Sequence, residues 1–208
     1  VDADHLAEFV SRAMSEAGTP DEAEPVRAVI VPHAGYSYSG ATAGKCFGLL
    51  DGARIHRVMV LGPTHYVGFH GVSVPTYSAY RTPLGLVKVD RTLCAELRAA
   101  HPLFTFREDC HTREHSIEVE LPFLQMQVAE FTMVPLVFGK LSWAEVRQVA
   151  GVLSAYWDES TLVVVSSDFT HYGSYYDYAP FPVSEAPEKI EELDHGAIHC
   201  IEAQDGDG

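Results

Sequence analysis

The chain has 208 residues, which is enough for one domain with a sizeable hydrophobic core. It carries 14 Lys and Arg residues against 29 Asp and Glu residues, so its net charge is −15. Proteins that bind phosphate backbones or anionic membranes need clustered basic residues, and this composition therefore argues against both partners. The sequence has no apolar run of membrane-spanning length and no basic-then-apolar signal pattern at its start. We therefore expect a cytoplasmic protein.

The four cysteines are far apart and form no CxxC pair, so we expect free thiols and neither a zinc ribbon nor a dithiol redox motif. They are Cys46, Cys94, Cys110 and Cys200.

Helical and extended patterns alternate along the chain. Apolar spacing, caps and breakers predict helices at 2–17, 40–50, 91–100, 114–130, 142–156 and 187–203. Strands are predicted at 26–31, 57–61 and 70–77, the last at a sheet edge, and in the segments FTMVPLVFGKL and LVVV. Pro122 should kink the helix at 114–130. This alternation predicts an α/β fold, a three-layer α/β/α sandwich around a mostly parallel sheet. We expect one domain over residues 1–208, truncated at both ends.

Three segments have the same sequence pattern, in which an apolar run is followed by a turn of small residues and then by a histidine. The segments are AVIVPHAGYSYSG, VMVLGPTHY and LVVVSSDFTHY, and they deliver His33, His65 and His171. If these strands are parallel neighbours, their histidines converge at the carboxyl ends, where ligands of such sheets bind. Two histidines and one anionic ligand would suit non-haem iron, copper or zinc. The alternative for each histidine is a packed or solvent-exposed side chain.

Two further groups could move protons. Asp168 lies three residues before His171 and could orient its imidazole, although Asp168 could instead cap a turn while His171 faces water. His115 and Glu118 would share one face of the helix predicted at 114–130, and Glu114 lies one turn from Glu118. The alternative there is an acidic, solvent-exposed helix surface.

Five motifs occur in a fixed order: PHAGYSYSG, LGPTHY, YRTPLG, EHSIEVELPFLQ and VVSSDFTHYG. Together they resemble the Memo family, which includes the AmmeMemoRadiSam system protein B, and the resemblance covers residues 26–194. It implies a fold similar to that of the class III extradiol dioxygenases. It also implies a site of two histidines and a cysteine that binds iron or copper.

The motifs carry family roles onto single residues. The histidines of PHAGY and GPTHY imply that His33 and His65 are metal ligands. The histidine of SSDFTHY implies an acid/base role for His171 beside Asp168, and the EHSIE motif places His115 in the same pocket. The ligand cysteine of the family belongs to a motif beyond SSDF that Cys200 does not match, so the resemblance identifies no third ligand in this chain.

The resemblance implies a metal-binding protein with an iron or copper cofactor, zinc being a further possibility, that acts as an oxidoreductase on a small molecule. The alternative is a non-catalytic module that binds a peptide or small ligand in the same cleft. Catechol ring cleavage is a weaker third option because the carboxylate ligand of the dioxygenases has no matched position.

Overall fold

The structure is a computed structural model that describes residues 2–18 and 25–206. Contacts divide the chain into two compact units, Val1–Ser167 and Asp168–Gly208, and each is described by itself. The predicted single domain, truncated at both ends, stays a prediction. Within the described residues, no helix combines the length and apolar character needed to cross a membrane.

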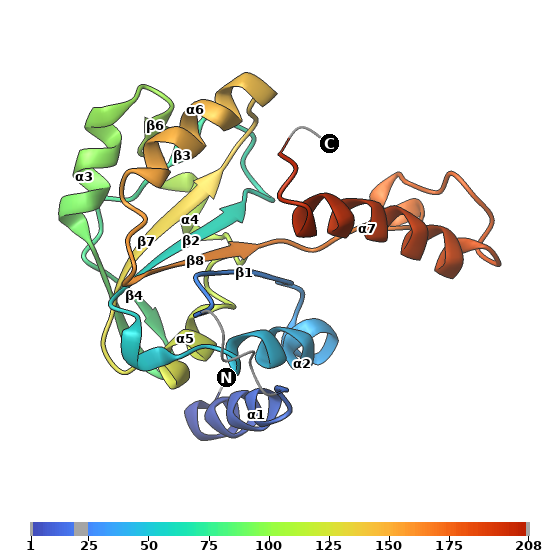
Figure 1. Cartoon of the computed structure of the whole chain (residues 1–208), viewed down its shortest axis with the longest axis horizontal. Helices are drawn as coiled ribbons and strands as arrows, with labels where there is room; N and C mark the ends of the chain where they lie inside the picture. Colours follow the sequence, from blue (N-terminus) through green and yellow to red (C-terminus); the bar gives the residue numbers. More distant parts are fainter. Residues whose placement is uncertain (1, 19–24, 207–208) are drawn as a thin grey trace. The chain divides into compact units, whose positions relative to one another are not determined.

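The first unit is built on an eight-stranded mixed sheet in which most neighbouring strands are parallel (Figure 1). The strand order is β1-β8-β2-β7-β3-β6, and the β4–β5 hairpin joins β7 through β5. Only β3–β7 and β4–β5 pair antiparallel among the strands of the described chain. The strands are β1 (Ala28–Val31), β2 (Arg57–Pro63), β3 (Val72–Ser73), β4 (Ala79–Thr82), β5 (Gly85–Val89), β6 (Phe104–Thr105), β7 (Thr132–Phe138) and β8 (Thr161–Ser166).

Helices flank this sheet on both sides. Figure 1 shows α1, α2 and α5 on one side and α3 and α6 on the other, and the helices of each group contact one another. The helices of this unit are α1 (Ala3–Ser15), α2 (Tyr36–Phe47), α3 (Arg91–Ala100), α4 (Asp109–Thr112), α5 (Leu121–Gln127), α6 (Trp143–Ser154) and a short 3-10 turn, η1 (Gly52–Arg54). The α/β fold with a mostly parallel sheet between helices confirms the predicted fold class.

The central strand shows why the sheet is covered on both faces. Val58, Met59 and Val60 follow one another in β2 and are all buried, although successive side chains point to opposite faces. Such a continuous apolar run requires helices on each side of the sheet. Helices α1, α3 and α6 begin at residues whose side chains cap them. For α3 the Asp90 carboxylate accepts from the Leu93 N–H at 3.0 Å.

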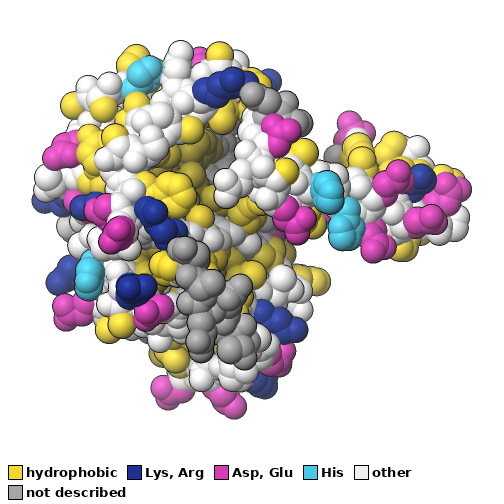
Figure 2. Space-filling model, in the orientation of Figure 1, with side chains coloured by type: hydrophobic (Ala, Val, Ile, Leu, Met, Phe, Trp, Pro, Cys, Tyr) yellow, Lys and Arg dark blue, Asp and Glu magenta, His cyan; other side chains and the backbone are white. Residues whose placement is uncertain are grey.

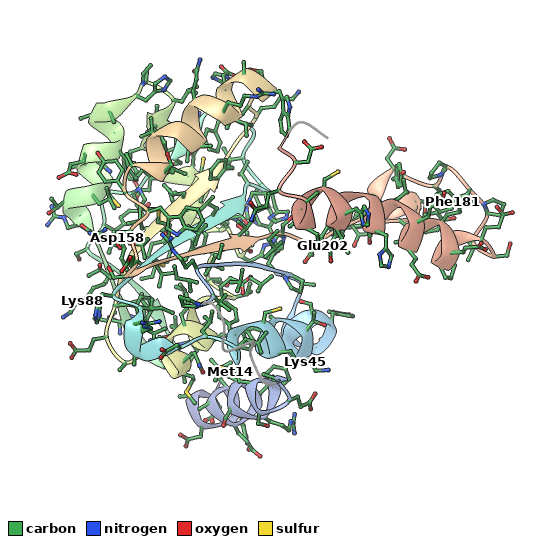
Figure 3. All side chains as sticks on the ribbon, in the orientation of Figure 1. Met14, Lys45, Lys88, Asp158, Phe181 and Glu202 are labelled. Atoms are coloured by element: carbon green, nitrogen blue, oxygen red, sulfur yellow. The ribbon has the colours of Figure 1, made fainter. Side chains whose placement is uncertain are left out.

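An ionic cluster holds together the amino-terminal ends of the strands. Arg57 Nε lies 3.2 Å from Asp90 Oδ2, and its Nη1 lies 3.6 Å from Asp158 Oδ2. Asp158, labelled in Figure 3 at the start of β8, also accepts hydrogen bonds from Ser160 and Thr161. Strands β2 and β8 are thereby held at the end of the sheet opposite to their carboxyl ends.

The segment 114–130 differs from the predicted kinked helix. Residues 114–115 have no regular secondary structure, residues 116–120 form turns, and α5 begins only at Leu121. Pro122 thus lies in the first turn of α5, where the missing N–H costs nothing. Pro122 therefore starts a helix instead of bending one. The predicted apolar stripe is nevertheless buried; it consists of Ile117, Leu121, Leu124 and Val128.

The strand predicted at 70–77 is also different. Only Val72 and Ser73 form a strand, β3, and it lies between β7 and β6, not at an edge. The segment YRTPLG, which gave no strand signal, contains the end of β4, the two-residue turn at 83–84 and the first residue of β5. Two-residue strands such as β6 are too short for periodicity to reveal.

The second unit contains the 3-10 turn η2 (Ser174–Tyr176) and one long helix, α7 (Ala186–Glu202). Figure 2 shows several acidic side chains over α7. Glu188, Glu191 and Glu192 of this helix are exposed. The helix predicted at 187–203 is confirmed, and all four cysteines are free thiols as expected.

A buried histidine joins three elements of the first unit. His111 of α4 places Nε2 3.0 Å from the Ser73 hydroxyl of β3 and Nδ1 2.8 Å from the Tyr80 hydroxyl of β4. Burial lowers the pKa of His111 to about 4, although the negative charge of Glu114 opposes this shift. His111 is therefore neutral at pH 7.

This depressed pKa predicts a loss of stability in mild acid. Because the unfolded chain protonates His111 near pH 6.5 and the folded chain only near pH 4, unfolding is favoured as pH falls through that window. The shift corresponds to as much as about 3 kcal/mol of unfolding free energy. Urea unfolding of chelator-treated protein at several pH values should show this slope, and His111→Gln should flatten it. The exposed His70→Gln is the control; equal slopes in both variants would contradict the assignment.

Candidate metal centre

His33 follows the carboxyl end of β1 and is buried, with 3% of its surface exposed. Its Nδ1 lies 2.9 Å from the hydroxyl of Ser166, the last residue of the neighbouring strand β8. Ser166 also donates to the carbonyl oxygen of Ser116. Because a hydroxyl has a single proton, Ser166 then accepts from Nδ1–H of His33. A metal would therefore bind His33 through Nε2.

His65 follows β2 and is oriented by a buried carboxylate. Its Nδ1 lies 2.8 Å from Glu114 Oε1, and its backbone N–H donates to Glu114 Oε2 at 2.7 Å. Burial alone would raise the pKa of Glu114, but the hydrogen bonds from His65 and from the Ser116 N–H lower it to about 2. Glu114 is thus ionised at neutral pH, and it selects the His65 tautomer that leaves Nε2 to a ligand.

His115 brings a third imidazole to the same place. Its ring centroid lies 4.5 Å from that of His65 and 5.8 Å from that of His33. One potential ligand atom from each of the three rings lies within 4.8 Å of the others. These three imidazoles could hold a metal ion.

A close approach of two segments makes this convergence possible. Gly62, near the end of β2, lies against Ser116 and Ile117, and a Cβ at Gly62 would come within 2.5 Å of Ser116 Oγ. The same Ser116 hydroxyl donates to the Pro63 carbonyl oxygen at 2.8 Å. Glycine at position 62 therefore lets the turn that carries His115 sit beside the strand end that carries His65.

The donor set fits a transition metal. His115 Nδ1 is buried and, among the described residues, has no partner at hydrogen-bond distance; Glu114 Oε1 lies 3.6 Å from it. A ligand could complete this nitrogen. Neutral imidazoles suit iron, copper and zinc, and a carboxylate behind one of them raises its basicity. The carboxylate behind His65 and the hydroxyl behind His33 are the outer partners that metal-binding histidines usually have.

The tyrosines near the histidines differ in character. Tyr36 donates to the Val119 carbonyl oxygen at 2.8 Å, and burial, then Glu120 and Glu118, raise its pKa, so it is a structural group. The Tyr66 ring centroid lies 6.0 Å from that of His115, whereas Tyr38 is 87% exposed.

His171 and Asp168 both belong to the second unit. His171 Nε2 lies 3.6 Å from Asp168 Oδ2, and Nδ1 lies 3.0 Å from the Phe169 carbonyl oxygen. The imidazole and the carboxylate thus lie close together, as the three-residue spacing of Asp168 and His171 predicted. The acid/base role of this pair stays a prediction.

The structure brings together His33, His65 and His115 of the predicted residues. It places His115 as a possible third ligand, whereas the sequence indicated only an acid/base or pocket-lining role. Glu114, for which the exposed acidic surface was the alternative reading, is buried beneath His65. Ser166 carried no signal of its own, although its place at the end of β8, beside the end of β1, could have suggested a contact with His33.

The packing at Gly62 generates a stability prediction. Gly62→Ala should lower the unfolding free energy by roughly 1–3 kcal/mol, because the new methyl group overlaps Ser116 in a closely packed site. Gly68→Ala is the matched control, since a Cβ at Gly68 meets no atom within 4 Å. Urea unfolding of the chelator-treated variants measures both, and equal stabilities would contradict the close approach.

Comparison with known proteins finds a family match over the whole chain. A family model described as Memo-like protein matches residues 1–208. The chain is 37% identical over 182 residues to the protein memo-1 homolog of Caenorhabditis elegans, covering 85% of this chain and 52% of that protein. It is 34% identical over 188 residues to the protein MEMO1 of Homo sapiens, covering 87% of this chain and 63% of that protein.

The protein MEMO1 of Danio rerio is 33% identical over 207 residues, covering 96% of this chain and 68% of that protein. The chain thus spans about half to two thirds of the length of these curated relatives. The match to the family model and the identity to these relatives establish that the chain belongs to the Memo-like protein family.

Proposed function

We propose that this chain binds an iron or copper ion through His33 and His65, with His115 as the third side chain that reaches the ion, and that it acts as a metal-dependent oxidoreductase. The observation that carries the proposal is the convergence of the three imidazoles, with ligand atoms within 4.8 Å of one another. The bound ion would supply redox and Lewis-acid chemistry to a small-molecule substrate.

The protein contributes the orientation of the ligands. Ser166 and Glu114 each engage an Nδ1 atom, so the imidazoles of His33 and His65 are aimed before any ion arrives. The ionised Glu114 also compensates the positive charge that an ion brings into a partly buried place. His171, with Asp168 beside it, is the group that we propose to move protons on the substrate.

The metal content of histidine variants tests the ligand set. Chelator-treated protein reconstituted with Fe(II) under argon, or with copper, should retain about one ion per chain after desalting. His33→Ala, His65→Ala and His115→Ala should each lose most of it, because each removes one of three ligands. His70→Ala is the control, since His70 is exposed and hydrogen-bonded to Glu145 outside the cluster.

The outcomes separate the possible roles. Equal metal content in His33→Ala and His70→Ala would contradict the site. Full metal content in His115→Ala alone would return His115 to an acid/base role. Oxygen uptake by the metal-loaded protein with catechols tests ring cleavage. Stoichiometric ligand binding without turnover would favour the non-catalytic binding module.

The carboxylate behind His65 gives a separate prediction. Glu114→Gln should weaken metal binding by roughly 10–100-fold, because the amide no longer supports the imidazole with a negative charge. Competition with a chromophoric chelator measures the affinity. Glu118→Gln, an exposed acid four residues away, should leave the affinity unchanged. The same affinity in both variants would contradict the role of Glu114.

A further inference from the structure

A pocket lies outside the three-histidine cluster, between the segment that leads into β4 and the short helix α4. Its volume is about 300 Å³, near the lower end of the range for small-molecule sites. Three of its lining side chains are aromatic or imidazole rings and one is a carboxylate. The lining residues are Tyr77, Ala79, Tyr80, Glu108, His111 and Thr112.

The rings of this pocket are held at steep angles to one another. The Tyr77 ring centroid lies 6.3 Å from that of Tyr80 with an interplanar angle of 66°, and 5.9 Å from that of His111 with an angle of 89°. Phe106 supports Tyr77 at 5.6 Å between centroids. Ring faces therefore point in several directions around one small space.

The electrostatics of the pocket favour a cation. Glu108 supplies a negative charge, and burial followed by this charge raises the pKa of Tyr77. His111 is neutral at pH 7 and does not repel a cation. The lining residues within the described chain include no Lys or Arg. Nearby Arg107 is engaged elsewhere, with Asp109 Oδ2 at 2.7 Å and the Phe69 ring centroid at 5.7 Å.

The hydrogen-bonding capacity of the pocket narrows the kind of cation. The Tyr80 hydroxyl is engaged with His111 Nδ1, and the other ring nitrogen of His111 contacts Ser73. A primary ammonium has three donors to satisfy, and Glu108 is the charged acceptor among the side chains that line the pocket, so its hydration would be replaced only in part. A methylated ammonium has no N–H to satisfy and binds to aromatic faces by cation–π attraction.

We propose that this pocket binds a quaternary ammonium group, carried either by a small molecule or by a trimethylated lysine side chain. The ring faces of Tyr77, Tyr80 and His111 contact the methyl groups, and Glu108 balances the charge. This site is separate from the metal centre and does not rest on the function proposed for it.

NMR titration of the full chain with choline tests the proposal. We expect shifts at Tyr77 and Tyr80 and a dissociation constant on the order of 1 mM, as a few cation–π contacts predict. 3,3-Dimethylbutanol, the neutral analogue of choline, should bind at least about tenfold more weakly, because it has the same shape and no charge. Equal binding of the two compounds, or no binding of choline, would overturn the proposal.

Variants locate the binding to this pocket. Tyr77→Leu and Glu108→Gln should each weaken choline binding by at least about fivefold. Glu96→Gln is the control, because it removes one negative charge from an exposed site on α3 that does not line the pocket. If Glu96→Gln weakens binding as much as Glu108→Gln does, the effect is general electrostatics and the proposal fails. Thermal unfolding confirms that each variant is folded.

A second ligand distinguishes the two sources of the cation. A short peptide with a central trimethyllysine is titrated beside choline. Binding at least tenfold tighter than that of choline assigns the pocket to a modified side chain, and comparable or weaker binding assigns it to a small molecule. In both cases the same peptide with unmodified lysine should bind more weakly, and equal binding of the two peptides would contradict recognition of the methyl groups.

Discussion

The buried carboxylate of Glu114 is the interaction on which the histidine cluster depends. It accepts hydrogen bonds from the backbone N–H groups of His65, His115 and Ser116 and contacts the His65 imidazole. An unpaired carboxylate in this position would cost several kcal/mol, whereas one with these donors is ionised and stable. The same group thus fixes the loop after β2, the turn that follows α4 and the orientation of one imidazole.

The parallel sheet supplies the rest of the geometry. Strands β1, β8 and β2 are adjacent and parallel, so the loops that follow β1 and β2 open at the same end of the sheet. The Ser166 hydroxyl at the end of β8 contacts His33, and Gly62 admits the turn that carries His115. At the other end of the strands the Arg57 ion pairs hold the sheet. The amino-terminal ends of the strands are thus stabilised by ion pairs, whereas their carboxyl ends hold the histidines that could bind a metal.

His111 and His115 lie four residues apart in the chain but have different hydrogen-bonding environments. His111 is enclosed by Ser73 and Tyr80, and burial keeps it neutral. His115, four residues later, has a buried nitrogen without a hydrogen bond within the described structure. The first is a satisfied structural group that also shapes the aromatic pocket, and the second is a group that a ligand would complete.

The sequence by itself determined the family, the α/β class and the two histidines that follow β1 and β2, because continuous apolar runs and ordered motifs are local signals. It also determined the buried stripe from Ile117 to Val128, even though the helix predicted at 114–130 was longer than α5. Only the tertiary structure decided that His115 joins His33 and His65, because that contact spans some fifty to eighty residues and depends on the absence of a side chain at Gly62. The burial of Glu114 was equally a tertiary outcome, since its hydrogen-bond donors include the backbone of a loop 49 residues away in the chain.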